Sequence, residues 1–115
     1  MTVTIYHNPG CSKSRAALAL LEKHGISPEI VEYLQTPPSK SELTIILNKL
    51  GMEPRELMRK KEEPYRALNL AEESLDRDAL IDAMIENPIL IERPVVINRG
   101  KYILGRPPEN VLEIL

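Results

Sequence analysis

The stretch TVTIYHNPGCSKSRAALALLEKHGISPEIVEYL, residues 2–34, decides the fold of this 115-residue chain. Apolar residues alternate over 2–7, which predicts a short strand. Residues 12–24 place aliphatic side chains at helical spacing before Gly25, a residue that favours a helix C-terminus. Residues 29–34 include Ile30, Val31 and Tyr33, which favour β-structure, and predict a second strand. This β-α-β order favours a parallel strand pair joined by a right-handed crossover.

The rest of the chain predicts helical segments, then a β-hairpin, then a last helix. The hairpin follows from two apolar runs, 94–97 and 101–104, joined by the tight turn Asn98-Arg99-Gly100. Four helical segments are expected before the hairpin: a helix that begins at the capping box Ser39–Glu42, a short turn from Pro54, a small helix near Tyr65–Leu68 and a helix from Asp76 to Glu86. One more helix is expected after the hairpin, through Leu115, with Pro107 and Pro108 near its first turn.

Composition favours a single globular domain, residues 1–115, with 43% hydrophobic and 28% charged residues. The net charge of −2 gives no reason to expect nucleic acid or an anionic membrane as a partner. No apolar run approaches the roughly 18 residues of a membrane span, and the N-terminus lacks the pattern of a signal peptide. We therefore expect a cytoplasmic protein, and a monomer because no helix face is left apolar.

Cys11 is the only cysteine, so the chain cannot form an internal disulfide. It lies between the first strand and the first helix, where unpaired N–H groups, Lys13, Arg15 and His7 could lower the pKa of its thiol. The same helix N-terminus can receive an oxyanion. The alternative is a small, buried and inert cysteine, which the polar flank disfavours. The sequence therefore predicts a reactive thiolate.

The unit CSKS, residues 11–14, has the shape of a C-x-x-C redox motif with Ser14 in place of the second thiol. A thiol that resolves a mixed disulfide must then come from another molecule. An arginine follows four residues after the cysteine rather than six, which argues against a phosphatase loop of the C-x5-R type. The two histidines, His7 and His24, lie on different elements, so no metal site is expected.

Several separated motifs resemble the ArsC family of glutaredoxin-coupled arsenate reductases, most closely its small bacterial homologues. The resemblance covers nearly the whole chain and implies a thioredoxin-like fold, a four-stranded mixed sheet flanked by helices with a helical insertion between strands 2 and 3. It also implies a cis peptide bond before Pro94. The motifs are His7-Asn8-Pro9-x-Cys11, Tyr33-Leu34-x-Thr36-Pro37-Pro38, Leu57-Met58-Arg59-Lys60, Glu63-Pro64-Tyr65, Asn87-Pro88-Ile89-Leu90-Ile91-x-Arg93-Pro94 and Arg106-Pro107.

The resemblance also implies roles for individual residues. Cys11 matches the nucleophile of the family, and His7 matches a histidine associated with ionisation of the cysteine. Three arginines match residues that bind the oxyanion, namely Arg59, Arg93 and Arg106. Residues expected to support the site are Asn8, Ser12, Ser14 and Arg15. The remaining arginines are expected to be solvated surface charges: Arg55, Arg66, Arg77 and Arg99.

The activity implied is reduction of arsenate to arsenite through attack by Cys11, with glutathione as co-substrate, glutaredoxin as partner and no bound cofactor or metal. One alternative is a glutathione-dependent thiol oxidoreductase of the same fold without arsenate activity. Another is a thioredoxin-fold regulatory binding protein, although such relatives carry their own C-x-x-C pair. Arsenate reductases of this type have Gly-Thr after the cysteine, whereas this chain has Ser12-Lys13, so the choice of substrate stays open.

Overall fold

The computed structural model describes residues 2–115 and divides the chain into two compact units. The first, here called the sheet unit, runs up to Thr36 and resumes at Arg93–Leu115. The second, here called the helical unit, is Pro37–Glu92. The helical unit is therefore an insertion between the second and third strands, as the resemblance implied.

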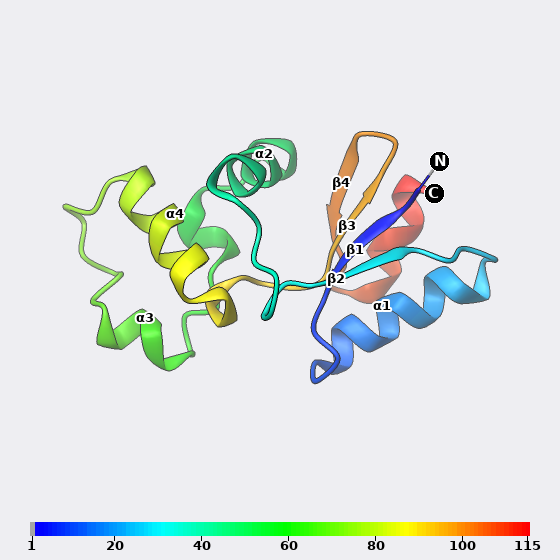
Figure 1. The fold of residues 1–115 in the computed structure, drawn as a ribbon, viewed down its shortest axis with the longest axis horizontal. Coiled ribbons are helices and arrows are strands. Elements are labelled where there is room, and N and C mark those ends of the chain that lie inside the picture. Colours follow the sequence, from blue (N-terminus) through cyan, green and yellow to red (C-terminus); the bar gives the residue numbers. More distant parts are fainter. Residues whose placement is uncertain (1) are drawn as a thin grey trace. The chain divides into compact units, whose positions relative to one another are not determined.

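The sheet unit contains a four-stranded mixed sheet, as predicted (Figure 1). The strand order is β2-β1-β3-β4. Strand β1 is parallel to β2 and antiparallel to β3, and β3 and β4 form the predicted hairpin. The elements are β1 (Thr4–His7), α1 (Ser12–Lys23), β2 (Glu29–Glu32), β3 (Val95–Asn98), β4 (Lys101–Leu104) and the 3-10 helix η3 (Pro108–Ile114).

Strand register brings three chain segments to one end of the sheet. Tyr6 near the end of β1 pairs with Val95 at the start of β3, and Val95 pairs with Leu104 at the end of β4. The residues that follow β1, precede β3 and follow β4 therefore emerge together. These segments carry Cys11, Arg93 and Arg106.

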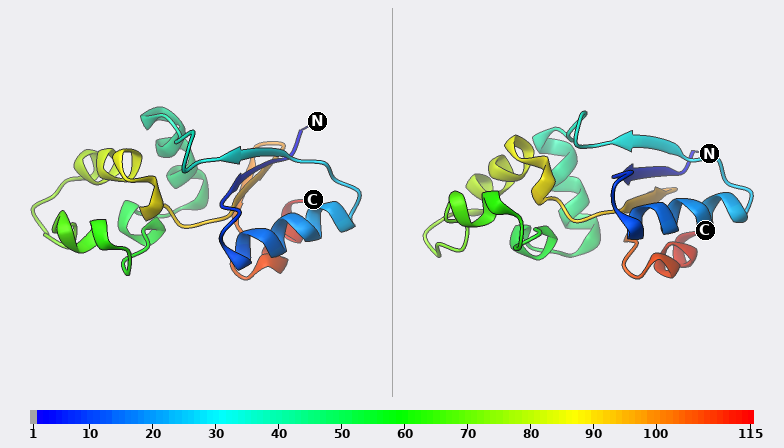
Figure 2. Two further views of the ribbon diagram at one scale, coloured as in Figure 1. Left: turned by 60° about the horizontal axis from the view of Figure 1, so that its bottom comes forward. Right: turned by 90° about the horizontal axis from the view of Figure 1, so that it is seen from below.

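One face of the sheet is covered by α1 and η3, which pack against each other (Figure 2). The core between them is aliphatic, because the chain has no Phe or Trp. Full burial of such a side chain contributes about 1.5–3 kcal/mol. The buried cluster comprises Val3, Ile5, Ala17, Leu21, Val96, Val111 and Ile114.

Gly105 lets the chain pass close to this core immediately after β4. A Cβ at this position would lie 2.9 Å from Cγ of Pro94 and 3.2 Å from Cγ1 of Val111. The Gly105 N–H donates to the carbonyl oxygen of Pro94 at 2.8 Å. This close approach fixes the backbone from which Arg106 extends.

The helical unit is built on α2 and α4, which pack together and whose buried side chains are aliphatic or methionine. The predicted capping box is present: the Ser39 N–H donates to Oε1 of Glu42 at 2.8 Å, and the Glu42 N–H donates to Oγ of Ser39 at 3.1 Å. Asp76 caps α4 by accepting from the Ala79 N–H at 2.8 Å. The elements are α2 (Lys40–Leu50), η1 (Pro54–Leu57), α3 (Glu63–Ala67), α4 (Arg77–Glu86) and η2 (Pro88–Leu90).

The short helical segments differ from the sequence prediction in type and position. The last helix is a 3-10 helix over Pro108–Ile114 rather than an α-helix, and the turn at Pro54 is also 3-10. Both are short segments that start at a proline, and 3-10 geometry is common in such short pieces. The small helix begins at Glu63, two residues before the predicted start.

Two arginines expected to be solvated instead make structural contacts. The guanidinium of Arg55 donates through Nε to the carbonyl oxygen of Leu70 at 2.9 Å and through Nη2 to that of Glu72 at 2.6 Å. Arg77 donates through Nη1 to Oε2 of Glu53 at 2.6 Å. The expectation was wrong for Arg55, because a loop without regular structure offers carbonyl groups that a guanidinium can satisfy. Arg77 is a surface charge, as expected, but it pairs with an exposed carboxylate.

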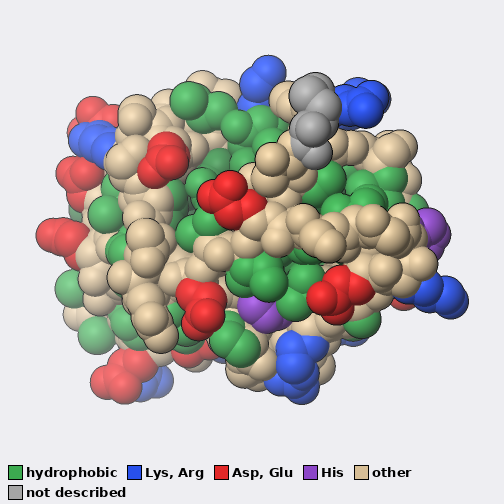
Figure 3. Space-filling view, turned by 45° about the vertical axis from the view of Figure 1, so that its right-hand side comes forward, with side chains coloured by type: hydrophobic (Ala, Val, Ile, Leu, Met, Phe, Trp, Pro, Cys, Tyr) green, Lys and Arg blue, Asp and Glu red, His purple; other side chains and the backbone are tan. Residues whose placement is uncertain are grey.

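On the face shown in Figure 3, acidic and basic side chains are scattered among apolar ones rather than gathered into one large area of a single sign. Among residues 2–115, no helix has both the length and the apolar character needed to cross a membrane.

Candidate active site

Cys11 is the N-cap residue of α1 and is half-buried. The loop before it is closed by short-range bonds around Asn8. The Cys11 N–H donates to the carbonyl oxygen of Asn8 at 3.0 Å, and the Gly10 N–H donates to Oδ1 of Asn8 at 2.9 Å. The loop thus presents the thiol in front of the first turn of the helix, where backbone N–H groups are unpaired.

The surroundings of the thiol favour its ionised form. Burial raises the pKa of Cys11, but the backbone N–H groups of Ser14 and Lys13 and the guanidinium of Arg93 lower it by more. The pKa of the thiol therefore lies below its ordinary value. Because the thiolate is the nucleophilic form, this environment favours reactivity near neutral pH.

Two predicted arginines converge on the thiol. Arg93, only 7% exposed, interacts with Cys11 through its side chain. Its Nε and Nη1 atoms are buried and have no hydrogen-bond partner in the described part of the chain. Arg106 donates through Nη1 to the carbonyl oxygen of Arg93 at 3.2 Å and lies 4.0 Å from Sγ of Cys11. The Arg93–Pro94 bond is cis, as predicted, and so is Arg106–Pro107.

His7 lies at the end of β1 and contacts Ser14. Its Nδ1 is 2.6 Å from Oγ of Ser14, and both side chains are buried. Burial lowers the pKa of His7 and outweighs the opposing effect of Glu32, while Arg15 lowers it further. His7 is therefore largely neutral at pH 7, and the structure connects it to Ser14 rather than to an ion pair with the thiol.

Ser12 and Arg15, two residues predicted to support the site, occupy the exposed side of the first turn of α1. Arg15 donates through Nη1 to the carbonyl oxygen of Pro9 at 2.8 Å, which ties the helix to the loop. This bond could not be predicted from the sequence, because it depends on how the loop turns back.

Arg59, the third predicted oxyanion ligand, belongs to the helical unit. Its Nε donates to Oε2 of Glu62 at 3.2 Å and its Nη1 donates to Oε1 of Glu92 at 2.7 Å. Burial lowers the pKa of Arg59, but these two carboxylates raise it by more. Sequence reasoning missed both partners; the three-residue spacing from Arg59 to Glu62 was the only available signal.

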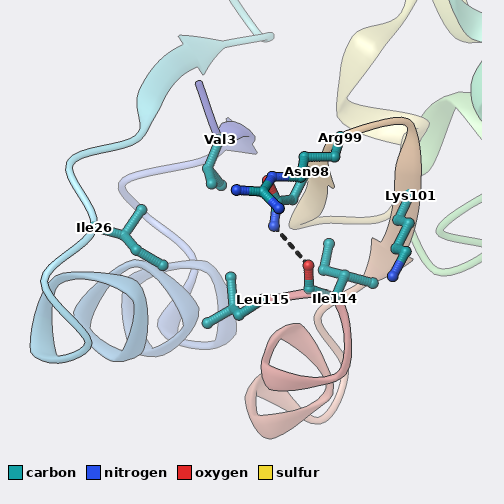
Figure 4. A pocket seen from close by; sticks show the side chains of 7 residues that line it. All are labelled: Val3, Ile26, Asn98, Arg99, Lys101, Ile114 and Leu115. Carbon is teal, nitrogen blue, oxygen red and sulfur yellow. Dashed lines mark hydrogen bonds between the residues drawn. The ribbon is translucent and has the colours of Figure 1, made fainter. Parts of the chain in front are cut away.

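A pocket of about 300 Å³ lies near the opposite end of the sheet (Figure 4). Asn98 spans part of it by donating through Nδ2 to the carbonyl oxygen of Ile114 at 2.6 Å. None of the candidate active-site residues lines it; its lining is Val3, Ile26, Asn98, Arg99, Lys101, Ile114 and Leu115.

The mixed sheet, the covering helices and the thiol at the N-terminus of α1 define a thioredoxin-like protein with a single cysteine at the start of its first helix. The profile of the ArsC family matches residues 6–114, and the chain belongs to that family.

Relatives of the chain are similar over nearly its full length. The chain is 56% identical to the uncharacterized protein YfgD of Escherichia coli, over 98% of this chain and 96% of that protein. It is 47% identical to an arsenate reductase of Escherichia coli, over 98% of this chain and 80% of that one. The solved structure of an arsenate reductase from Vibrio cholerae is 56% identical, with a TM-score of 0.96 over 100% of this chain and 98% of that chain.

Proposed function

We propose that this protein reduces arsenate to arsenite with Cys11 as the nucleophile. The observation that carries the proposal is the position of the thiol at the N-terminus of α1, with a lowered pKa and with Arg93 and Arg106 beside it. Relatives named arsenate reductase support the choice of arsenate as the oxyanion.

In the proposed reaction, the Cys11 thiolate attacks arsenic(V) and a protonated oxygen leaves as water. The thiol of glutathione then displaces a second oxygen and bonds to arsenic. A glutaredoxin thiolate attacks the glutathione sulfur, forms a mixed disulfide and leaves two electrons on arsenic. Hydrolysis releases arsenite and regenerates the Cys11 thiol. Overall, two external thiols become one disulfide and arsenic(V) becomes arsenic(III), which suits a chain whose only thiol is Cys11.

The arginines have a defined task in this reaction. Guanidinium groups make paired, charge-assisted hydrogen bonds to oxyanions. Arg93 and Arg106 would bind the arsenate oxygens and the charge that develops as Cys11 attacks. Arg59, the third arginine implied by the resemblance, is paired with Glu62 and Glu92 and would contribute less. The same charges stabilise the thiolate before substrate arrives.

The reaction also suggests where the protein works. A free catalytic thiol that depends on glutathione fits a reducing compartment, so we propose the cytoplasm as its location.

The test is a coupled assay with arsenate, glutathione and glutaredoxin. The unchanged protein should consume reducing equivalents only when arsenate is present, and Cys11→Ser should abolish this. Arg66→Ala is the matched control, because Arg66 is an exposed arginine outside the site, and it should keep full activity. Equal rates for the unchanged protein and Cys11→Ser would refute the proposal.

A second candidate is a glutathione-dependent thiol oxidoreductase without arsenate activity. It is favoured by Ser12-Lys13 in place of Gly-Thr after the cysteine. This candidate predicts a stable adduct between Cys11 and glutathione, measured by intact mass, whose turnover by glutaredoxin does not respond to arsenate. The assay above with and without arsenate therefore separates the two candidates.

A further inference from the structure

The hydroxyl of Ser14 joins the first turn of α1 to the end of β1 and to the loop between them. It accepts a hydrogen bond from the backbone N–H of Asn8 at 3.0 Å and lies 2.6 Å from Nδ1 of His7. Ser14 is 0% exposed, His7 6% and Asn8 8%. The first turn of α1 is thus bonded, within the protein interior, to the end of β1 and to the loop that carries Cys11.

The hydrogen bonds at the Ser14 hydroxyl indicate which ring nitrogen of His7 carries the proton. Oγ already accepts from the Asn8 N–H, so its own proton needs an acceptor. In the part of the chain that the structure describes, Oγ also lies within hydrogen-bond distance of Nδ1 of His7. A neutral His7 that carries its proton on Nε2 accepts at Nδ1 from Ser14, and this gives the hydroxyl proton its acceptor. Protonation of Nδ1 would leave the hydroxyl proton without an acceptor.

This bonding affects the thiol through the backbone. The N–H groups of Ser14 and Lys13 both favour the Cys11 thiolate, and they can do so only while the first turn faces the thiol. The second tie between helix and loop, from Arg15 to Pro9, is exposed to solvent. Buried hydrogen bonds restrict geometry more strongly than exposed ones. The Ser14 hydroxyl is therefore the contact best placed to hold the N–H groups against the sulfur.

We propose that Ser14 is the positioning residue of this site and that His7, as a neutral imidazole, acts on Cys11 through the Ser14 hydroxyl. The inference rests on the nucleophile of the proposed function but not on its substrate, so it is tested without arsenate. His7 is then an orienting group rather than the ion-pair partner of the thiolate.

The primary test is the pH dependence of Cys11 alkylation by iodoacetamide, which reports the pKa of the thiol. Removing the hydroxyl in Ser14→Ala should lower the thiolate fraction at neutral pH about tenfold, equivalent to a shift of roughly one pKa unit. His7→Ala should lower the thiolate fraction to a smaller extent. In the Ser14→Ala background, His7→Ala should have no additional effect, because the contact through which it acts is already gone. An equal effect of His7→Ala in both backgrounds would overturn the proposal.

Two further variants separate positioning from general stability. Ser14→Thr keeps the hydroxyl and should retain most of the thiolate. Leu21→Ala empties part of the core on the same helix and should lower the melting temperature without changing the alkylation profile. A profile that shifts equally in Leu21→Ala and Ser14→Ala would show that loss of stability, not loss of positioning, is responsible.

A measurement on the unaltered protein keeps the proposal testable even where a variant does not fold. The ¹⁵N chemical shifts of His7 at pH 7 should show a neutral ring with the proton on Nε2 and an unprotonated, hydrogen-bonded Nδ1. A proton on Nδ1 would overturn the assigned direction of the bond, and with it the proposal.

Discussion

The predicted oxyanion-binding arginines have opposite surroundings in the two units. In the sheet unit, Arg93 and Arg106 lie beside the Cys11 thiol, and Arg106 also donates to a backbone carbonyl. In the helical unit, Arg59 is held by the carboxylates of Glu62 and Glu92. The three arginines stand in equally recognisable motifs. A motif therefore predicts which arginine is present in the chain. The groups packed around that arginine decide how strongly its positive charge can attract an anion.

The difference has a simple electrostatic consequence. Arg59 with its two carboxylates is a group of one positive and two negative charges, which does not favour an approaching anion. Arg93 is buried and its positive charge acts on the Cys11 thiol, which its guanidinium favours in the ionised form. Burial strengthens such charge interactions because the surroundings are less polarisable than water. We therefore expect the sheet-unit arginines to dominate the chemistry.

The largest effect is expected for Arg93→Ala. The change removes a thiolate-stabilising cation and a set of oxyanion donors at once, and should lower kcat/KM for arsenate by roughly 100-fold or more, as for other donors to a developing oxyanion. Steady-state kinetics would measure it, with Arg93→Lys as the control that keeps the charge but not the fork of donors. If Arg93→Ala and Arg59→Ala lowered kcat/KM by similar factors, the expected difference between the two units would be wrong.

Gly105→Ala tests the backbone that places Arg106. The added Cβ would meet Cγ of Pro94 at 2.9 Å and Cγ1 of Val111 at 3.2 Å. Overpacking of this kind costs about 1–3 kcal/mol, which urea denaturation can measure. Gly10→Ala is the control, because its Cβ would only meet Oδ1 of Asn8 at 3.4 Å, and it should unfold near the unchanged midpoint. If Gly105→Ala did not change the free energy of unfolding, the close backbone approach at this position would not be required for stability.

Glu92→Gln tests whether the carboxylates restrain Arg59. Glutamine can still accept from Nη1 of Arg59 but carries no charge, so KM for arsenate should fall by about threefold while kcat changes little. The same substitution in an Arg59→Ala background should leave KM unchanged. If KM falls equally in both backgrounds, Glu92 acts on the substrate without involving Arg59.

The smallest effect expected is on the pH dependence of stability. The pKa of Cys11 in the folded protein is below its reference value of 9.0. The unfolded state therefore binds more protons between these two pKa values, so stability rises with pH across that window. The contribution is fully present above 9.0 and is lost as the pH falls through the folded pKa. Urea titrations of the unchanged protein should show this slope, and Cys11→Ser should lack it.

Much of the fold could be predicted because its signals are local. The alternation in β1, the hairpin turn and the caps at Ser39 and Asp76 involve residues close in sequence, and all are present in the structure. The 3-10 character of η3 could not be predicted from apolar spacing, because α- and 3-10 helices share similar patterns over so few residues.

The candidate site was predictable only in part. Cys11 could be placed at a helix N-terminus from the Pro-Gly break and the helix that follows, which is a local inference. The close contact of His7 with Ser14 could not, because it depends on the rotation of α1 against β1. Nor could the pairing of Arg59 with Glu92, which lies 33 residues away in the chain.

The sequence by itself determined the strands, the main helices and a single thiol with no partner in its own chain, because residue type and short spacing control these properties. Only the tertiary structure decided which charges surround that thiol. Strand register brings Arg93 and Arg106 to the end of the sheet that carries Cys11. Packing in the helical unit sets two carboxylates against Arg59. Electrostatic interactions depend on distance in space, and distance in space between remote residues is fixed only when the chain folds.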